Sequence, residues 1–210
     1  MSHQLPPTVE KATAYCTYCP KLCRFSCPAA EAENRETVTP WGMMRLLEFV
    51  RTGDVEPSEE VAETFYHCMG CRRCNTWCKH DNDVPEAMWE ARALMRELGH
   101  VPAELDGFVD FFLEENSPHS ASKPLEKVED AFDPESPIVF FPDCETRHHY
   151  PELVGAAGRL FEAIEGRKAR LHTRDGGKGH ACCGFPLTSA GDAQQYARYR
   201  EELEFTLAGA

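Results

Sequence analysis

The sequence lacks the segments that direct a protein out of the cytoplasm or into a bilayer. Its N-terminus, MSHQLPPTVEK, contains no apolar core of the kind that secretory signal peptides carry. No apolar run approaches the ~20 residues that a membrane-spanning helix needs. We therefore expect a cytoplasmic protein, which reaches the inner face of a membrane only through its partners.

Positive charge is also scarce, with 22 lysines and arginines against 35 aspartates and glutamates and a formal net charge of −13. Proteins that bind nucleic acid need a basic patch to meet the phosphates, so the composition argues against a nucleic-acid partner. An acidic exterior suits docking on a basic partner surface, and it equally suits a protein that is simply well solvated.

The motifs of nucleotide-binding and nucleophilic enzymes are missing as well. The turn Asp175-Gly-Gly-Lys-Gly-His180 has the glycines of a phosphate loop but not its GK[ST] order. The chain carries neither a dinucleotide fingerprint nor a recognisable nucleophile triad. We therefore assign no catalytic residue and expect catalysis to take place on partner proteins.

Cysteine, in contrast, is abundant, with eleven residues in a chain of 210 that gather in short runs. A disulfide scaffold requires an oxidising compartment, which the missing signal sequence argues against. The first run reads Cys16-x2-Cys19-x3-Cys23-x3-Cys27-Pro28, and the second reads Cys68-x2-Cys71-x2-Cys74-x3-Cys78. Close triplets followed by a fourth cysteine are typical of cubane iron–sulfur clusters, whereas zinc sites need only CxxC pairs. The two runs predict two [4Fe-4S] clusters.

In two-cluster ferredoxins the fourth cysteine of each run ligates the other cluster. The same crossover here predicts two ligand sets: Cys16, Cys19, Cys23 and Cys78 for cluster 1, and Cys68, Cys71, Cys74 and Cys27 for cluster 2. The pattern departs from that of ferredoxins at two points. Three residues rather than two separate Cys19 from Cys23, and Lys79 replaces the proline that usually follows the fourth cysteine. Cys78 is therefore the ligand with the weakest sequence support.

Residues 1–115 predict an α-helical ferredoxin-like domain that holds these two clusters. Residues 1–14 are polar and carry two adjacent prolines, so we expect a loose lead-in. Proline, capping and periodicity signals then predict helices over four stretches, namely 40–53, 58–67, 84–99 and from 102 onward. The mostly helical stretch between the cysteine runs leaves no room for the β-hairpins of a compact ferredoxin.

Residues 116–136, rich in proline, serine and charge, read as a linker with a short helical turn. Beyond it, residues 137–210 have an α/β pattern. Apolar stretches at 138–141 and 169–173 predict strands, and 151–166 and 191–207 predict helices. This order is that of a parallel βαβα unit. Because two strands alone do not make a stable sheet, we expect something to extend it.

A third group of cysteines follows the two predicted strands and consists of Cys144, Cys182 and Cys183. Ligands of open α/β sheets bind at the carboxyl ends of the strands, so this group predicts a metal site. It can hold a third iron–sulfur cluster or a zinc ion whose fourth ligand is a histidine, namely His148, His149 or His180. The alternative is that two of the three are inert, buried cysteines.

The two quartets followed by Cys144 and by the Cys182-Cys183-Gly184-Phe185-Pro186 segment resemble heterodisulfide reductase-related iron–sulfur subunits. That group includes the iron–sulfur subunits of glycolate oxidase and anaerobic glycerol-3-phosphate dehydrogenase. The resemblance implies an α-helical domain with two [4Fe-4S] clusters, followed by a cysteine-rich CCG domain. It also implies electron transfer between a flavin-containing dehydrogenase partner and a quinone, thiol or disulfide acceptor.

Members of this group usually contain two CCG halves, which together hold a non-cubane cluster, and this chain shows one. We therefore expect residues 137–210 to be the first half of a CCG domain, in a fragment or an incomplete domain. Three functions follow from the sequence. The leading one is an electron-transfer subunit, the second is a disulfide reductase that acts at the CCG cysteines, and the third is a structural zinc module.

Overall fold

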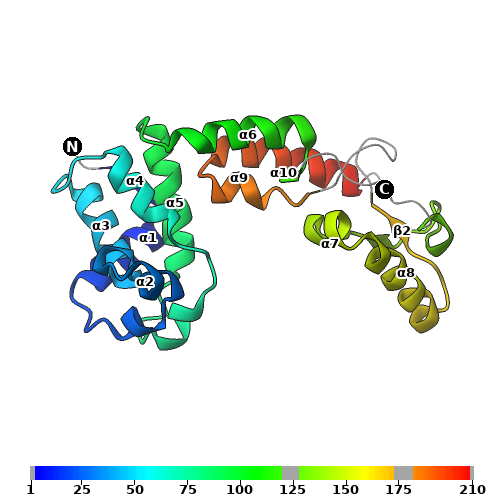
Figure 1. The fold of residues 1–210 in the computed structure, drawn as a ribbon, viewed down its shortest axis with the longest axis horizontal. Coiled ribbons are helices and arrows are strands. Elements are labelled where there is room, and N and C mark those ends of the chain that lie inside the picture. Colours follow the sequence, from blue (N-terminus) through cyan, green and yellow to red (C-terminus); the bar gives the residue numbers. More distant parts are fainter. Residues whose placement is uncertain (1–2, 120–127, 173–181, 209–210) are drawn as a thin grey trace. The chain divides into compact units, whose positions relative to one another are not determined.

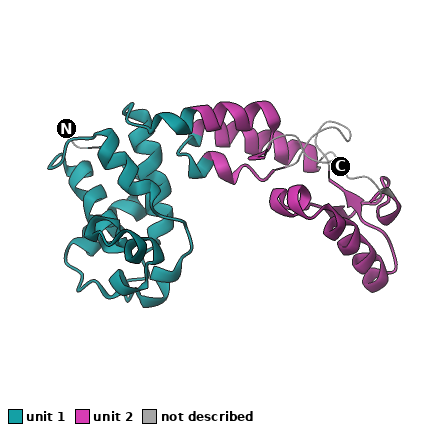
Figure 2. Cartoon of the chain, viewed as in Figure 1, with its two compact units in different colours: residues 1–106, 188–193 teal, residues 107–187, 194–210 magenta. Residues whose placement is uncertain are grey.

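The computed structural model describes residues 3–119, 128–172 and 182–208. The protein is mostly helical and includes a small two-stranded sheet (Figure 1). It divides into two compact units, residues 1–106 with 188–193 and residues 107–187 with 194–210 (Figure 2). In the described part of the chain, no helix combines the length and the apolar character needed to cross a bilayer. The domain boundaries predicted near 115 and 136 stay predictions.

The first unit is built from helices and short 3₁₀ turns, and these are, in chain order, α1 (Pro7–Thr17), η1 (Leu22–Ser26), α2 (Pro28–Glu33), η2 (Glu36–Val38), α3 (Pro40–Thr52), α4 (Glu59–Tyr66), η3 (Arg73–Trp77) and α5 (Val84–Glu97). Helix α3 is central, because α1, α4 and α5 all pack against it. Its side chains Met43, Met44, Leu47 and Val50 are fully buried among those of α5 and α4. Cys16 and Cys74 belong to this core, and Cys23 and Cys68 pack against it.

Helix α3 begins and ends where its sequence signals predict. The Thr39 hydroxyl accepts the backbone N–H of Gly42 at 3.0 Å, and Pro40 occupies the first helical position, where no N–H is needed. Gly53 follows the last turn with φ +81°, the left-handed conformation that glycine adopts without strain. The prediction of a buried helix over 40–53 is confirmed.

The expected loose lead-in over residues 1–14 is wrong, because these residues form most of helix α1. Pro7 stands in the first turn, and Val9, Ala12, Thr13 and Cys16 are buried at the three- and four-residue spacing of one helix face. This face packs on α3 and α5. Its side chains are small and one is polar, so the periodic signal is weak. Cys16 consequently sits in the last turn of a helix.

The second unit contains helices and a short sheet, with the elements α6 (Ala103–Glu115, which begins in the first unit), η4 (Glu129–Ala131), β1 (Val139–Phe140), α7 (Cys144–His149), α8 (Pro151–Glu165), β2 (Arg170–Leu171), α9 (Phe185–Ser189, which ends in the first unit) and α10 (Ala193–Ala208, whose first residue belongs to the first unit). The strands pair in parallel, with Val139 opposite Arg170 and Phe140 opposite Leu171. The parallel βαβ connection is therefore confirmed. It contains two helices rather than one.

The core of this sheet region draws on residues before and after it. Val128, Ala131 and Phe132 are buried together with Val154 of α8 and Ala169. Gly158 lets Phe132 lie against α8, because a Cβ at that glycine would meet the Phe132 ring at 2.8 Å. The glycine-rich turn over 175–180 lies outside the described residues.

Candidate functional site: two cysteine-lined cavities

The two cysteine runs fold alike. Each carries a residue in the left-handed conformation, Lys21 at φ 65° and Arg72 at φ 58°, directly before a five-residue 3₁₀ turn. Each turn contains the third cysteine of its run, and the fourth cysteine follows the turn directly. The additional residue of the first run is absorbed before this shared motif, near the exposed Pro20. The turns η1 and η3 pack against each other.

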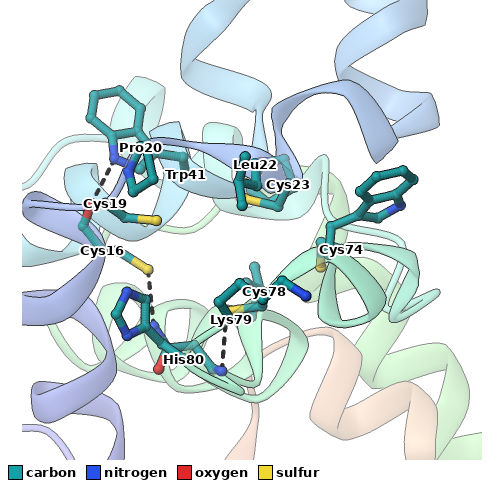
Figure 3. Close-up of a pocket in the computed structure, with 14 residues that line it drawn as sticks. Cys16, Cys19, Pro20, Leu22, Cys23, Trp41, Cys74, Cys78, Lys79 and His80 are labelled. Atoms are coloured by element: carbon teal, nitrogen blue, oxygen red, sulfur yellow. Dashed lines mark hydrogen bonds between the residues drawn. The ribbon is translucent and has the colours of Figure 1, made fainter.

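A first cavity lies between the two runs (Figure 3). Five cysteines line it, namely Cys16, Cys19, Cys23, Cys74 and Cys78. Trp41 of α3 forms part of the wall, and its Nε1 donates a hydrogen bond to the carbonyl oxygen of Cys16 at 2.7 Å. The fourth thiol of the second run therefore lies with the first three thiols of the first run.

Asn82 connects the two chain segments that meet in this cavity. Its side-chain amide lies 3.3 Å from Cys16 Sγ and 3.3 Å from the carbonyl oxygen of Ala12, and its backbone N–H donates to Cys78 Sγ at 3.4 Å. Its exposed fraction is 7%. Hydrogen bonds of this kind stabilise thiolates and tune the clusters that they ligate. The stretch after Cys78, which lacks the usual proline, is thus joined to helix α1 through the hydrogen bonds of Asn82.

A second cavity lies beside the first and is lined by four cysteines, Cys27, Cys68, Cys71 and Cys74. Cys74, Pro40 and Val84 line both cavities. The first cavity therefore combines three cysteines of the first run with Cys74 and Cys78 of the second, and the second cavity combines Cys27 with three cysteines of the second run.

Arg92 holds the start of the second run in place. This α5 residue is only 3% exposed, and its guanidinium donates to the carbonyl oxygens of Phe65 and Cys68 as well as to Ser189. It also lies over the Tyr66 ring, 4.9 Å from the centroid. Burial lowers the pKa of Arg92. The sequence did not reveal this role, because an arginine inside an apolar helix face gives no sign of its carbonyl partners.

The thiols of the two cavities are chemically suited to a metal cluster. Burial raises the pKa of Cys16 and of Cys74 to about 12 and that of Cys23 to about 11. In the absence of metal these groups are therefore neutral at physiological pH, and a bound metal would displace their protons. Four converging thiols, two of them already accepting N–H groups in the first cavity, fit the donor set of a [4Fe-4S] cluster.

The third cysteine group is in the second unit. Cys144 begins α7, and its Sγ lies 3.9 Å from Cys182 Sγ. Hydrogen bonds with Cys144 and Cys183 raise the pKa of the Cys182 thiol. The same thiol lowers the pKa of Cys144, and it lowers that of Cys183 to about 6. The structure thus brings the three predicted cysteines together around one shared proton donor.

Tyr199 of α10 packs against the Cys182–Gly184 turn and is hydrogen-bonded to it. Its hydroxyl donates to the carbonyl oxygen of Cys182 at 2.9 Å, and its exposed fraction is 4%. Gly184 has φ +82°, and a Cβ there would lie 2.8 Å from the Tyr199 ring. The glycine of the CCG segment therefore allows the turn and the close approach of the tyrosine.

The structure describes two of the three histidines considered for a zinc site with the cysteines. His148 and His149 end α7 and lie beside His119, which sequence reasoning did not single out. His180 lies outside the described residues.

Residues 12–82 match the family model of the 4Fe-4S dicluster domain, and this range includes both quartets and Asn82. The chain is an iron–sulfur protein. It is also similar to a protein of Bacillus subtilis (strain 168) named probable glycolate oxidase iron-sulfur subunit, with 30% identity over 106 residues. That similarity covers 48% of this chain and 24% of the relative, so the chain spans about a quarter of the relative's length. No solved structure matches.

Proposed function

We propose that this chain is an electron-transfer subunit of a multi-subunit oxidoreductase. In this proposal it relays electrons between a flavin-containing dehydrogenase and a quinone, thiol or disulfide acceptor. The observation that carries the proposal is the pair of adjoining cavities that the eight cysteines of the two runs line, with Cys74 in the wall of both. The name of the Bacillus subtilis relative, an iron–sulfur subunit of an oxidase, supports the same class of function.

The ligand assignment is part of this proposal. Cys16, Cys19, Cys23 and Cys78 hold one [4Fe-4S] cluster, and Cys27, Cys68, Cys71 and Cys74 hold the other. When bound, such clusters accept and release single electrons. The protein residues fix the clusters, exclude water with apolar walls such as Trp41 and Val84, and direct N–H groups at sulfur.

The surface around the cavities is suited to contact with a redox partner. Tyr18 and Phe25 of the first run are 90% and 85% exposed, and Trp77 of the second is 56% exposed. Arg24 and Arg73 are exposed in the same loops, although the whole chain is acidic. Aromatic and arginine side chains are enriched where proteins bind one another. We assign the dehydrogenase contact to this surface.

The test is the metal content and spectrum of the anaerobically purified protein. The proposal predicts about eight irons and equal sulfide per chain, together with electron paramagnetic resonance signals of reduced clusters. A colourless protein with stoichiometric zinc and no redox signal would show instead a structural zinc module, which chelators would unfold.

A second candidate function is disulfide reduction at Cys144, Cys182 and Cys183, with a third iron–sulfur cluster or a zinc ion. It is favoured by the convergence of these three sulfur groups and by the lowered pKa of Cys183. A third cluster would raise the iron content to roughly twelve per chain. Serine at Cys182 and Cys183 should then abolish turnover of a disulfide substrate and leave the signals of the two other clusters. Turnover that survives this change would exclude the second candidate.

A further inference from the structure

Three histidines from separate segments of the second unit lie together. His119 follows α6, and His148 and His149 end α7. One ring nitrogen from each histidine lies within 4.8 Å of the ring nitrogens of the other two. A group of three ligand atoms at this spacing could hold a metal ion. The rings of His119 and His148 stack with their centroids 4.5 Å apart, and His149 lies edge-on to both.

Glu145 adds carboxylate oxygens to this group. Its Oε1 lies 2.9 Å from Nε2 of His119, and its Oε2 lies 3.4 Å from Nε2 of His149. Glu145 and His149 are four residues apart on α7, so they share a helix face. The carboxylate therefore faces two of the three imidazoles.

Local hydrogen bonds hold both sides of the group. The Asp143 side chain accepts the backbone N–H of Thr146 at 2.8 Å and so caps α7. On the other side, the Ser117 hydroxyl accepts the backbone N–H of His119 at 3.0 Å. Ser117 is fully buried, and His119 exposes 17% of its side chain. These two hydrogen bonds fix the backbone on both sides of the histidine group.

We propose that His119, His148, His149 and Glu145 form a zinc site that is separate from the cysteine sites. Imidazole nitrogens and a carboxylate oxygen are ordinary zinc ligands, and tetrahedral zinc takes four of them. Bonds of the usual length place neighbouring ligand atoms about 3.4 Å apart, so nitrogens now within 4.8 Å need only small side-chain rotations.

The consequence of the site is a connection between two segments. The ion ties the segment after α6 to α7, whose first residue is Cys144. It would therefore fix the helix that presents this thiol to Cys182. The ion is bound by nitrogen and oxygen, which distinguishes it from a zinc ion held by Cys144, Cys182 and Cys183.

The test uses the full chain, purified anaerobically with its iron–sulfur clusters and equilibrated with zinc in a chelator buffer. We expect one zinc per chain, with iron unchanged, measured by elemental analysis. X-ray absorption at the zinc edge should show only a nitrogen and oxygen shell near 2.0–2.1 Å, without the sulfur shell near 2.3 Å that cysteine ligation gives.

Variants separate this site from the thiols. His119→Gln and His149→Gln should lose the zinc and keep the iron, and Glu145→Gln should weaken zinc binding by at least about 10-fold. His100→Gln, a histidine of the first unit, is the matched control and should bind zinc normally. The triple variant with serine at Cys144, Cys182 and Cys183 should also retain the ion.

Four results would overturn the proposal. These are a protein that binds no zinc, a sulfur shell around zinc, loss of zinc in the triple cysteine variant, and undiminished zinc in His119→Gln. If the histidine variants fail to fold, the zinc content and the absorption spectrum of the unaltered protein decide on their own. Because iron is measured separately, none of these results bears on electron transfer.

Discussion

The thiols of the two units differ in charge as well as in number. In the first unit, burial raises the pKa of Cys16 to about 12 and that of Cys23 to about 11. In the second unit, the hydrogen bond from Cys182 lowers the pKa of Cys183 to about 6. Cys16 and Cys23 are therefore neutral thiols that become charged when metal replaces their protons, whereas Cys183 is mostly a thiolate at neutral pH without a metal.

The two groups of thiols are therefore suited to different chemistry. The proposed ligand assignment divides the eight thiols of the first unit into two sets of four, which line two adjoining cavities that share Cys74. Three thiols of the second unit form a smaller group, in which Cys182 shares its proton with two neighbours. A set of four suits permanent ligation of a cluster. A set with a free thiolate suits exchange with a disulfide or ligation completed from elsewhere.

The largest predicted effect tests how the two sets of four are composed. Serine at both Cys19 and Cys78 removes two ligands from the same cavity, so one cluster is lost and about four irons remain. Serine at both Cys71 and Cys78 removes one ligand from each cavity, so both clusters are weakened and the iron content falls further. Anaerobic iron analysis of the two double variants measures this contrast.

An assignment in which each run holds its own cluster predicts the reverse order of iron contents. Two further double variants repeat the test with Cys27, the fourth cysteine of the first run. Serine at Cys27 and Cys71 should spare one cluster, and serine at Cys27 and Cys19 should affect both.

The second effect tests the charge of the thiols in metal-free protein. With a pKa of about 6, Cys183 is about 90% thiolate at pH 7 and about 10% at pH 5, so its alkylation should slow about 10-fold over that range. Because the pKa is lowered, Cys183 is mostly a thiolate above pH 6 and becomes a neutral thiol as the pH falls below 6. Cys16 should react far more slowly at both pH values. Iodoacetamide labelling followed by peptide mass spectrometry measures both rates.

The control for this titration removes its cause. Cys182→Ala deletes the thiol that lowers the Cys183 pKa, so the midpoint of labelling should move to higher pH. An unchanged midpoint would mean that the backbone N–H groups around Cys183, rather than Cys182, stabilise the thiolate.

The local features of the fold could be predicted from the sequence, because their causes lie within a few residues. Cysteine spacing predicted a domain with 4Fe-4S clusters, which the family match over residues 12–82 supports, and Thr39, Pro40 and Gly53 set the bounds of α3. The parallel strands also followed from short apolar runs. Helix α1 was missed because its buried face is made of small residues, whose periodicity stands out poorly against the charged face.

The features that could not be predicted depend on contacts between distant segments. Asn82 lies 66 residues from Cys16 along the chain, and Arg92 lies 97 residues from Ser189. His119 joins His148 and His149 only through the packing of the second unit. In each case the residue type allows many partners, and only the folded chain selects one.

The third prediction tests whether Asn82 stabilises the cluster proposed for the first cavity. Asn82→Leu keeps the volume but removes the amide that contacts Cys16 Sγ, so cluster 1 should be bound about 10- to 100-fold less tightly and should become harder to reduce. Chelator-driven iron release and redox titration measure this. Cluster 2 is the internal control, because the Asn82 contacts are made to the first cavity. Equal weakening of both clusters would indicate a general loss of stability instead.

The smallest effect concerns the support of the second unit's thiols. Tyr199→Phe removes the hydroxyl that donates to the Cys182 carbonyl and keeps the ring, which lies 5.4 Å from that of Phe112. The free energy of unfolding should fall by about 1 kcal/mol, measured by denaturant titration. Gly184→Ala, which combines φ +82° with a 2.8 Å approach to the same ring, should cost more. An unchanged free energy of unfolding in Tyr199→Phe would show that this hydrogen bond does not stabilise the second unit.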